Sequence, residues 1–299
     1  MRIDMEPSGK EEKFKAKGGV TVIRNPHKSN HPKARPGAPP RSRPRRFKHR
    51  MPNPASTAPN LPKDQAEKNK IKEKIQPVPK ALTDTGWIGT DESGKGDYFG
   101  PLVIGGVHVD SKTKNLLLNL KVRDSKKISD NVIKDLDYRI RSACIYSVVV
   151  IGPEKYNLLY QKMKNLNSLL AWGHARVIEN LLLRVECNKA ISDQFGSEQY
   201  IKNALMEMGK KIELIQMPGA EADLGVAAAS IVARAEFLRR MEKLSEDCGF
   251  PLPKGASDQV DSAARRIMEQ MGKEALNRFT KLHFKNTLRV MRVENQESS

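Results

Sequence analysis

The chain has 299 residues and carries 53 Lys and Arg against 35 Asp and Glu, which gives a net charge of +18. Its apolar runs are shorter than the roughly 18 residues that a membrane helix needs, and the composition therefore argues against a membrane protein. The N-terminus lacks a signal-peptide core, and its acidic residues do not suit a transit peptide. Cys144, Cys187 and Cys248 lie far apart. Their spacing disfavours a disulfide framework or a zinc site and favours a reducing compartment, so we expect a cytoplasmic protein.

Residues 1–80 differ in composition from the rest of the chain. They hold 21 Lys and Arg against 7 Asp and Glu, together with 13 of the 18 prolines. Such a segment cannot bury enough apolar surface to offset its ordering entropy, and we therefore expect a disordered basic arm. We expect its most basic part, residues 24–50, to bind nucleic-acid phosphates without sequence preference. A solubilising tail or a nuclear-localisation signal would have a similar composition.

An α/β pattern begins at residue 81, and we expect one globular domain over 81–290 followed by a flexible tail over 291–299. The pattern predicts strands at 87–90, 102–109, 145–151, 189–192 and 212–217. It predicts helices at 130–141, 154–164, 168–184, 198–208, 222–246 and about 255–272. Strands first, and then alternating helices and strands, indicate a mixed β-sheet with helices on both faces.

The loop after the first predicted strand combines two adjacent carboxylates with a glycine-rich turn. Asp91 and Glu92 are suited to hold a divalent cation. Gly94 and Gly96 let backbone amides come close to an anion, and Lys95 supplies the opposite charge. The same residue types are also common in ordinary turns, so a purely structural loop is the alternative.

Asp193 stands where the predicted strand 189–192 stops. The carboxyl ends of sheet strands face the crevice in which α/β proteins bind ligands. If this strand is a neighbour of strand 87–90, then Asp91 and Asp193 meet at one edge of the sheet.

Glu221 precedes the long predicted helix, a position that also suits helix capping, and Asp223 is either a substitute ligand or a first-turn acid. Carboxylates that converge without cysteine or histidine favour Mg²⁺ or Mn²⁺ over zinc. Two such ions would serve phosphodiester hydrolysis, one by activating water and the other by stabilising the leaving oxygen.

Other residues are weaker candidates. Lys126 lies in an Asp-Ser-Lys-Lys loop and is expected to hold a substrate phosphate, unless the loop is only a solvated charge run. Ser230 is kept as a substrate-binding candidate beside alanines that we interpret as packing residues. His283 is a possible substrate contact but is more typical of a core residue, and His108 and His174 are interpreted as core residues.

Taken in order, these motifs resemble the type 2 ribonuclease H family and, within it, ribonuclease HIII. The resemblance covers about residues 85–286. The matching segments are Gly-Thr-Asp-Glu-Ser-Gly-Lys-Gly-Asp-Tyr-Phe-Gly-Pro-Leu, Val-Arg-Asp-Ser-Lys-Lys-Ile, Tyr-Asn-Leu-Leu-Tyr, Asn-Leu-Asn-Ser-Leu-Leu-Ala-Trp-Gly-His, Ile-Ser-Asp-Gln-Phe, Ala-Glu-Ala-Asp through Val-Ala-Ala-Ala-Ser-Ile-Val-Ala-Arg, Leu-Pro-Lys-Gly-Ala-Ser and Lys-Leu-His-Phe. The Gly-Lys-Gly form distinguishes the chain from the Gly-Arg-Gly of ribonuclease HII.

The resemblance implies an RNase H-like fold and endonucleolytic cleavage of the RNA strand of an RNA–DNA hybrid, leaving 5′-phosphate and 3′-hydroxyl ends. It implies that the metal-binding catalytic carboxylates are Asp91, Glu92, Asp193 and Glu221. It also implies that the Gly94–Gly96 turn senses the ribose 2′-hydroxyl, which distinguishes RNA from DNA. We expect a monomer, associated with the nucleoid if the source is bacterial.

The chain stands apart from this pattern in two respects. Glu221 precedes Ser230 by nine positions, a spacing that we expect to vary between relatives. The second concerns the N-terminal segment. Typical ribonuclease HIII carries a folded N-terminal substrate-binding domain that resembles the TATA-binding protein, whereas residues 1–80 do not look like one. Hybrid affinity would then depend on the basic arm. Two alternatives share the motifs: a non-catalytic nucleic-acid-binding protein on a nuclease fold, and an enzyme that cuts at single ribonucleotides embedded in DNA.

Overall fold

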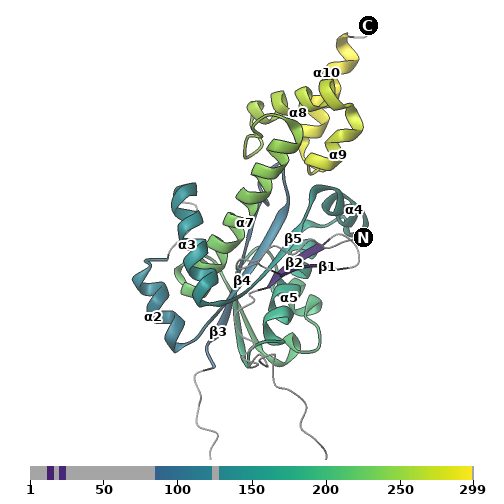
Figure 1. Cartoon of the computed structure of the whole chain (residues 1–299). Coiled ribbons are helices and arrows are strands. Elements are labelled where there is room, and N and C mark those ends of the chain that lie inside the picture. Colours follow the sequence, from purple (N-terminus) through teal and green to yellow (C-terminus); the bar gives the residue numbers. More distant parts are fainter. Residues whose placement is uncertain (1–11, 17–19, 25–84, 123–127, 298–299) are drawn as a thin grey trace, which may run out of the picture. The chain divides into compact units, whose positions relative to one another are not determined.

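The computed structural model describes residues 12–16, 20–24, 85–122 and 128–297. Its strands form one mixed sheet in the order β1-β2-β5-β4-β3-β6-β7 (Figure 1). The strands are β1 (Glu12–Ala16), β2 (Val20–Arg24), β3 (Trp87–Ser93), β4 (Leu102–Val109), β5 (Ile145–Ile151), β6 (Lys189–Asp193) and β7 (Glu213–Met217). The pairs β3–β4 and β4–β5 are antiparallel, whereas β3–β6 and β6–β7 are parallel. The predicted mixed sheet is confirmed.

Helices cover both faces of this sheet (Figure 1). They are α2 (Ser111–Asn119), α3 (Asp130–Ala143), α4 (Pro153–Met163), α5 (Leu166–Leu182), α6 (Gln199–Ala204), α7 (Leu224–Cys248), α8 (Asp258–Met271), α9 (Leu276–Phe279) and α10 (Lys285–Glu297). Three short 3₁₀ turns complete the described part: η2 (Gly209–Lys211), η3 (Ala220–Ala222) and η4 (Lys273–Ala275).

The side chains of β5 point alternately to the two faces of the sheet and so contact the helices on each face. Tyr146, Val148 and Val150 belong to the apolar cluster that also contains the buried faces of α3 and α7. Val149 and Ile151 belong to the cluster on the other face, with α4 and α5. Because successive strand residues point to opposite faces, a mostly apolar strand such as β5 packs against helices on both sides.

Helix α7 lies unusually close to the sheet where β3 approaches the candidate site. A Cβ atom on Gly89 of β3 would stand 1.9 Å from the carbonyl carbon of Gly225 in the first turn of α7. One on Gly105 of β4 would stand 2.6 Å from the backbone oxygen of Ala229. The small-residue stretch of α7 is therefore a packing face, as the sequence indicates, and it brings Ser230 over the carboxyl end of β3.

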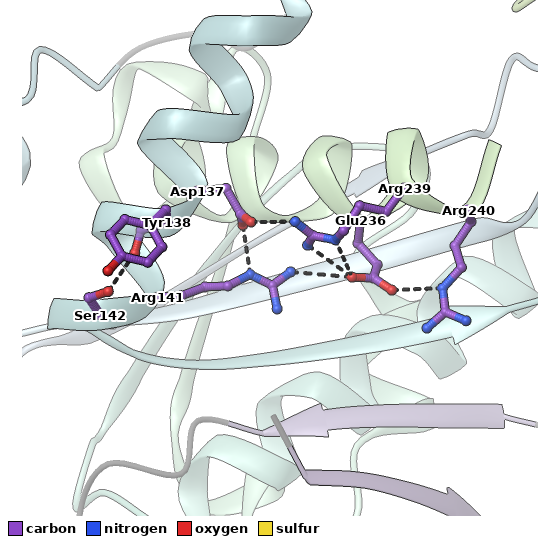
Figure 2. A network of polar contacts seen from close by, with 7 residues as sticks. All are labelled: Asp137, Tyr138, Arg141, Ser142, Glu236, Arg239 and Arg240. Carbon is purple, nitrogen blue, oxygen red and sulfur yellow. Dashed lines mark hydrogen bonds and ion pairs between the residues drawn. The ribbon is translucent and has the colours of Figure 1, made fainter. Parts of the chain in front are cut away.

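Buried charges join α3 to α7 (Figure 2). The Asp137 carboxylate accepts from Arg141 Nε at 2.7 Å and from Arg239 at 2.8 Å. Glu236 accepts from Arg239 at 2.9 Å and from Arg240 at 2.7 Å. Each buried carboxylate thus has at least two guanidinium partners, which offset the cost of removing its charge from water.

The structure departs from the sequence-based elements in three places. Strands β1 and β2 pair with each other, and β2 pairs with β5, although both lie in the segment expected to be an arm. The Val-Thr-Val-Ile run of β2 has strong β-propensity, which the average composition of residues 1–80 conceals. Helices α2, α9 and α10 are additions to the predicted elements. Helix α10 continues to Glu297, inside the segment 291–299 expected as a tail. The rest of residues 1–80 lies outside the described part of the chain.

Candidate active site

The register of the sheet brings two of the predicted carboxylates together. Strands β3 and β6 run parallel, with Thr90 opposite Ser192, so that Asp91 and Asp193 follow side by side at the carboxyl ends. Both aspartates line one cavity of about 620 Å³. The cavity is also lined by Glu92, Gly94, Lys95, Gly96 and Ser230. Seven of the predicted site residues therefore share a single hollow.

Asp91 is held by short-range contacts on two sides. The backbone N–H of Glu92 donates to its Oδ1 at 2.8 Å. The Ser230 hydroxyl forms a hydrogen bond with its side chain from the first turns of α7. Burial raises the pKa of Asp91, and the negative charge of Glu92 raises this pKa further. A cation in the cavity would lower the pKa of Asp91 again, because it favours the ionised carboxylate.

Glu92 has a partner for each carboxylate oxygen. Lys95 Nζ lies 3.3 Å from its Oε1, and His174 Nε2 lies 3.2 Å from its Oε2. Burial alone would raise the pKa of Glu92, but His174 and Lys95 together lower it below the usual value. Its two partners therefore favour the ionised form of Glu92, whereas burial and the charge of Glu92 disfavour the ionised form of Asp91.

His174 ends one of the matching sequence segments, but its sequence context indicates only a core residue and does not reveal its contact with Glu92. Its ring is fully buried, as expected of a core histidine. Its Nδ1 lies 2.9 Å from Thr90 Oγ1, and the ring stacks on Phe195 at 5.1 Å between centroids. These contacts hold the His174 ring in place, and the ring in turn fixes the Glu92 carboxylate. Sequence spacing gives no signal for this role, because its two polar partners belong to β3 while His174 belongs to α5.

Glu221 stands apart from the other three predicted carboxylates. It lies in the 3₁₀ turn η3 and is half-buried, but it does not line the cavity of Asp91. The neighbouring Ala220 N–H donates to Asp193 Oδ1 at 3.3 Å, which ties the turn to the end of β6. Asp223 caps α7 through the N–H groups of its first turn and accepts from Trp87 Nε1 at 2.9 Å. Those contacts give Asp223 the structural role of a helix cap.

The Gly-Lys-Gly turn is open to the cavity. Gly94 adopts φ 86°, and a Cβ there would stand 2.2 Å from the Pro101 carbonyl oxygen, so only glycine fits this position. Gly96 has open space around its Cα, and the Lys95 side chain is 40% exposed. The turn is therefore buried at Gly94 and exposed at Gly96, with all three of its residues lining the cavity.

Two further basic side chains reach the same cavity. Arg234 and Lys254 line it, and both pair with Asp130, at 2.8 Å and 2.7 Å. Asp130 is 40% exposed, so these ion pairs exchange readily with solvent and with an anionic ligand. Positive charge thus borders the carboxylates on the α7 side.

The remaining candidates lie elsewhere. Lys126 falls in residues 123–127, outside the described part of the chain. His283 stacks on Tyr160 at 4.2 Å and lines a different cavity of about 480 Å³. His108 contacts the Thr85 backbone oxygen at 2.8 Å. Neither histidine lines the carboxylate cavity. His108 is buried, as expected of a core residue, whereas His283 is exposed, so its interpretation as a core residue is wrong.

The residues in the cavity fit a hard divalent cation in chemistry but are not yet arranged around one. Asp91, Glu92 and Asp193 offer oxygen ligands, which Mg²⁺ and Mn²⁺ prefer. Among the residues that the structure describes, no three Asp, Glu, His or Cys side chains stand close enough to hold a metal ion. Glu92 is instead engaged by Lys95 and His174. Side-chain adjustment would be needed before these carboxylates could hold a metal ion together.

Known proteins share this arrangement of sequence and fold. The family profile described as Ribonuclease HII matches residues 88–287. Ribonuclease HIII of Protochlamydia amoebophila (strain UWE25) is 46% identical over 198 residues, which span 66% of this chain and 66% of that protein. Ribonuclease HIII of Chlamydia felis (strain Fe/C-56) is 48% identical over 201 residues, which span 66% of this chain and 67% of that protein.

Solved structures agree with the sequence comparison. The crystal structure of Bst-RNase HIII in complex with Mn²⁺ superposes with a TM-score of 0.65 at 32% identity, covering 77% of this chain and 81% of that one. RNase H3 of Aquifex aeolicus superposes with a TM-score of 0.56 at 29% identity, covering 74% and 79%. From the profile match, the relatives and the shared fold, the chain belongs to the type 2 ribonuclease H family of nucleases, in its ribonuclease HIII branch.

Proposed function

We propose that the chain is an endonuclease that hydrolyses the RNA strand of RNA–DNA hybrids. In this proposal the reaction depends on two divalent cations and leaves 5′-phosphate and 3′-hydroxyl ends. The observation that supports it best is one cavity lined by Asp91, Glu92 and Asp193 together with the Gly94–Gly96 turn. Carboxylates for a cation and amides for a ribose or phosphate are the two features that this chemistry requires.

Asp91, Glu92 and Asp193 would hold Mg²⁺ or Mn²⁺, with Glu221 completing the set after movement of the η3 turn. The solved complex of Bst-RNase HIII with Mn²⁺ supports a divalent ion in this family. When bound, the ions would activate water and stabilise the charge on the leaving oxygen. The protein contributes by fixing the carboxylates: Ser230 and the Glu92 N–H orient Asp91, and His174 orients Glu92.

The Gly94–Gly96 turn would present its backbone amides to the ribose 2′-hydroxyl, and Lys95 would neutralise a nearby phosphate. Lys95 is paired with Glu92 at 3.3 Å, so it becomes available to substrate only when that ion pair opens. A cation at Glu92 competes with Lys95 for the same oxygen, which links the two events. Lys126 and Ser230 remain proposed substrate contacts.

The basic arm is a second proposed contact with the substrate. The arm segment 24–50 would bind hybrid phosphates without reading sequence, because residues 13–63 contain no acid. No helix in the described ranges is long and apolar enough to cross a membrane. We propose a monomer that acts in the cytoplasm, or on the nucleoid, where hybrids form.

A cleavage assay with a labelled RNA–DNA hybrid tests the proposal. We expect cleavage with Mg²⁺ or Mn²⁺ and none with EDTA, with 5′-phosphate ends on the products. Binding without cleavage under every metal condition would instead identify a non-catalytic hybrid-binding protein. A DNA duplex with one embedded ribonucleotide, run in parallel, shows whether a single 2′-hydroxyl is sufficient for cleavage.

A further inference from the structure

Lys281 is a fully buried lysine outside the carboxylate cavity. Its ammonium nitrogen lies 2.7 Å from the Asp97 backbone oxygen, 2.8 Å from that of Gly100 and 3.3 Å from that of Phe99. An ammonium has three donors, and here each has a carbonyl partner. All three partners belong to the short segment that follows the Gly-Lys-Gly turn.

The main chain around Lys281 holds the same segment. The Lys281 N–H donates to the Tyr98 oxygen at 2.8 Å, and the Gly100 N–H donates to the Phe279 oxygen at 2.9 Å. With the side-chain contacts, Lys281 thus engages four consecutive carbonyls, from residue 97 to residue 100. Because one residue holds all four of these carbonyl groups, residues 97–100 have little freedom to move.

A second set of contacts fastens the opposite side of this segment. The Tyr98 N–H donates to the Gly255 oxygen at 2.9 Å, and the Gly255 N–H donates to Asp97 Oδ1 at 2.7 Å. The Tyr98 hydroxyl lies 3.0 Å from Thr287 Oγ1. The segment is therefore held between the loop before α8 and the chain that leads into α10.

Keeping a charge at this depth is costly. Burial lowers the pKa of Lys281 to about 7, although the Asp97 carboxylate opposes this shift. A buried amine, charged or neutral, is tolerated only where its N–H donors are satisfied, and an apolar side chain would fill the same space at less cost. The contacts of Lys281 therefore indicate a function that depends on its hydrogen bonds.

We propose that Lys281 is a positioning residue, which holds residues 97–100 so that the Gly94–Gly96 turn presents its amides to the ribose. This inference depends on the proposed function, because the turn is assigned to the substrate there. The turn has one end on β3 and the other on the segment that Lys281 holds. Releasing the second end lets the amides of the turn rotate away from a common ligand.

Two measurements that do not need cleavage test the inference. The variants are Lys281→Met, which removes all three donors, and Lys281→Gln, which retains two N–H donors without charge. The first measurement is amide hydrogen exchange of residues 94–100 by mass spectrometry. The second is the affinity for an RNA–DNA hybrid and for a matched DNA duplex, both measured in EDTA by fluorescence anisotropy.

We expect faster exchange at residues 94–100 and about tenfold weaker hybrid binding for Lys281→Met, with unchanged binding of the DNA duplex. Lys281→Gln should give smaller changes in the same direction, and it decides the test if Lys281→Met does not fold. Equal weakening of hybrid and DNA, or unchanged exchange in a folded variant, would overturn the inference. These readouts remain informative even if the wild type cuts no hybrid.

A matched control is Glu179→Gln. Glu179 is also buried and also fixes a loop, because it accepts from the N–H groups of Met206, Met208 and Gly209. We expect this substitution to lower the melting temperature while exchange at residues 94–100 and hybrid selectivity stay as in the wild type. If Glu179→Gln changed both as strongly as Lys281→Met, general loosening would explain the effect and the positioning role would be refuted.

Discussion

Asp91 and Asp193 occupy equivalent places on neighbouring parallel strands, one residue beyond the pair Thr90 and Ser192. Their proximity is therefore a property of the β3–β6 register and does not depend on a flexible loop. A one-residue slip of either strand would turn one carboxylate to the opposite face of the sheet. The sheet itself thus sets the spacing on which the proposed metal site depends.

Substituting Asp193→Asn removes a proposed ligand and keeps the shape of the side chain. We expect the cleavage rate to fall by about 10²-fold or more, because a bound ion contributes several kcal/mol and each 1.4 kcal/mol is tenfold in rate. Hybrid binding and the metal-free melting temperature should change little. Single-turnover assays measure the cleavage rate, anisotropy measures hybrid binding, and calorimetry measures the melting temperature. If the variant cleaved at the wild-type rate, Asp193 would not be a catalytic ligand.

His174→Ala leaves Glu92 without its partner at Oε2 and opens space below the cavity. We expect about a 10- to 100-fold loss in apparent Mn²⁺ affinity or in turnover, which is typical when a group that orients a metal ligand is removed. A titration of activity against Mn²⁺ concentration shows which of the two changes. His108→Gln, at a histidine outside the cavity, is the control and should leave the titration unaltered.

Glu236→Gln tests the buried charge network between α3 and α7 (Figure 2). Its side chain is 3% exposed, and its loss leaves guanidinium groups uncompensated, so we expect destabilisation of about 3 kcal/mol at neutral pH. Denaturant unfolding measures this change in free energy. Glu242→Gln, in an exposed pair with Lys134, should cost less than about 1 kcal/mol. Equal losses in both variants would argue against a special role for the network.

The same network predicts a dependence on pH. Burial alone would raise the pKa of Glu236, but Arg239, Arg240 and Arg141 lower it below the usual 4.5. The unfolded chain therefore binds the proton first as the pH falls. The stabilisation is fully present above the ordinary glutamate pKa and is lost as the pH falls through the lowered one. The gap in unfolding free energy between wild type and Glu236→Gln should narrow over that acidic range, and a constant gap would contradict the assignment.

The basic arm is tested by charge removal without truncation, because deleting residues 1–80 would also delete β1 and β2. The variant has glutamine in place of Arg41, Arg43, Arg45, Arg46 and Arg50. The slope of log affinity against log salt concentration should become less steep by about 0.9 for each phosphate that the arm no longer neutralises. An unchanged slope would show that the arm does not contribute to hybrid binding.

A second variant, with glutamine in place of Lys210 and Lys211, controls for the removal of positive charge outside the arm. These exposed lysines precede β7, at the end of the sheet opposite Asp193. We expect their removal to leave the salt dependence of hybrid affinity close to that of the wild type.

Much of the fold follows from local pattern. The strands at Leu102–Val109 and Ile145–Ile151 have the bounds that their apolar runs predict, because both strands are buried on both faces. The meeting of Asp91 with Asp193 also follows from strand ends, once β3 and β6 are neighbours.

Other features depend on contacts that a single sequence does not display. The sequence indicates a core residue at His174, which is indeed buried, yet its partner Glu92 comes from a distant strand. The burial of Lys281 is equally hidden, because a lysine is normally exposed. Glu221 stays a predicted ligand: it lies in the η3 turn, which contacts Asp193, but it does not line the cavity of Asp91.

The central claim is that Asp91, Glu92 and Asp193 bind divalent cations, and anomalous scattering from crystals soaked with Mn²⁺ tests it most directly. We predict at least one anomalous peak within ligand distance of the Asp91 and Asp193 carboxylates, with Lys95 moved away from Glu92. If crystals of an enzyme that cleaves hybrids showed Mn²⁺ only at other positions, the proposed metal site would be wrong.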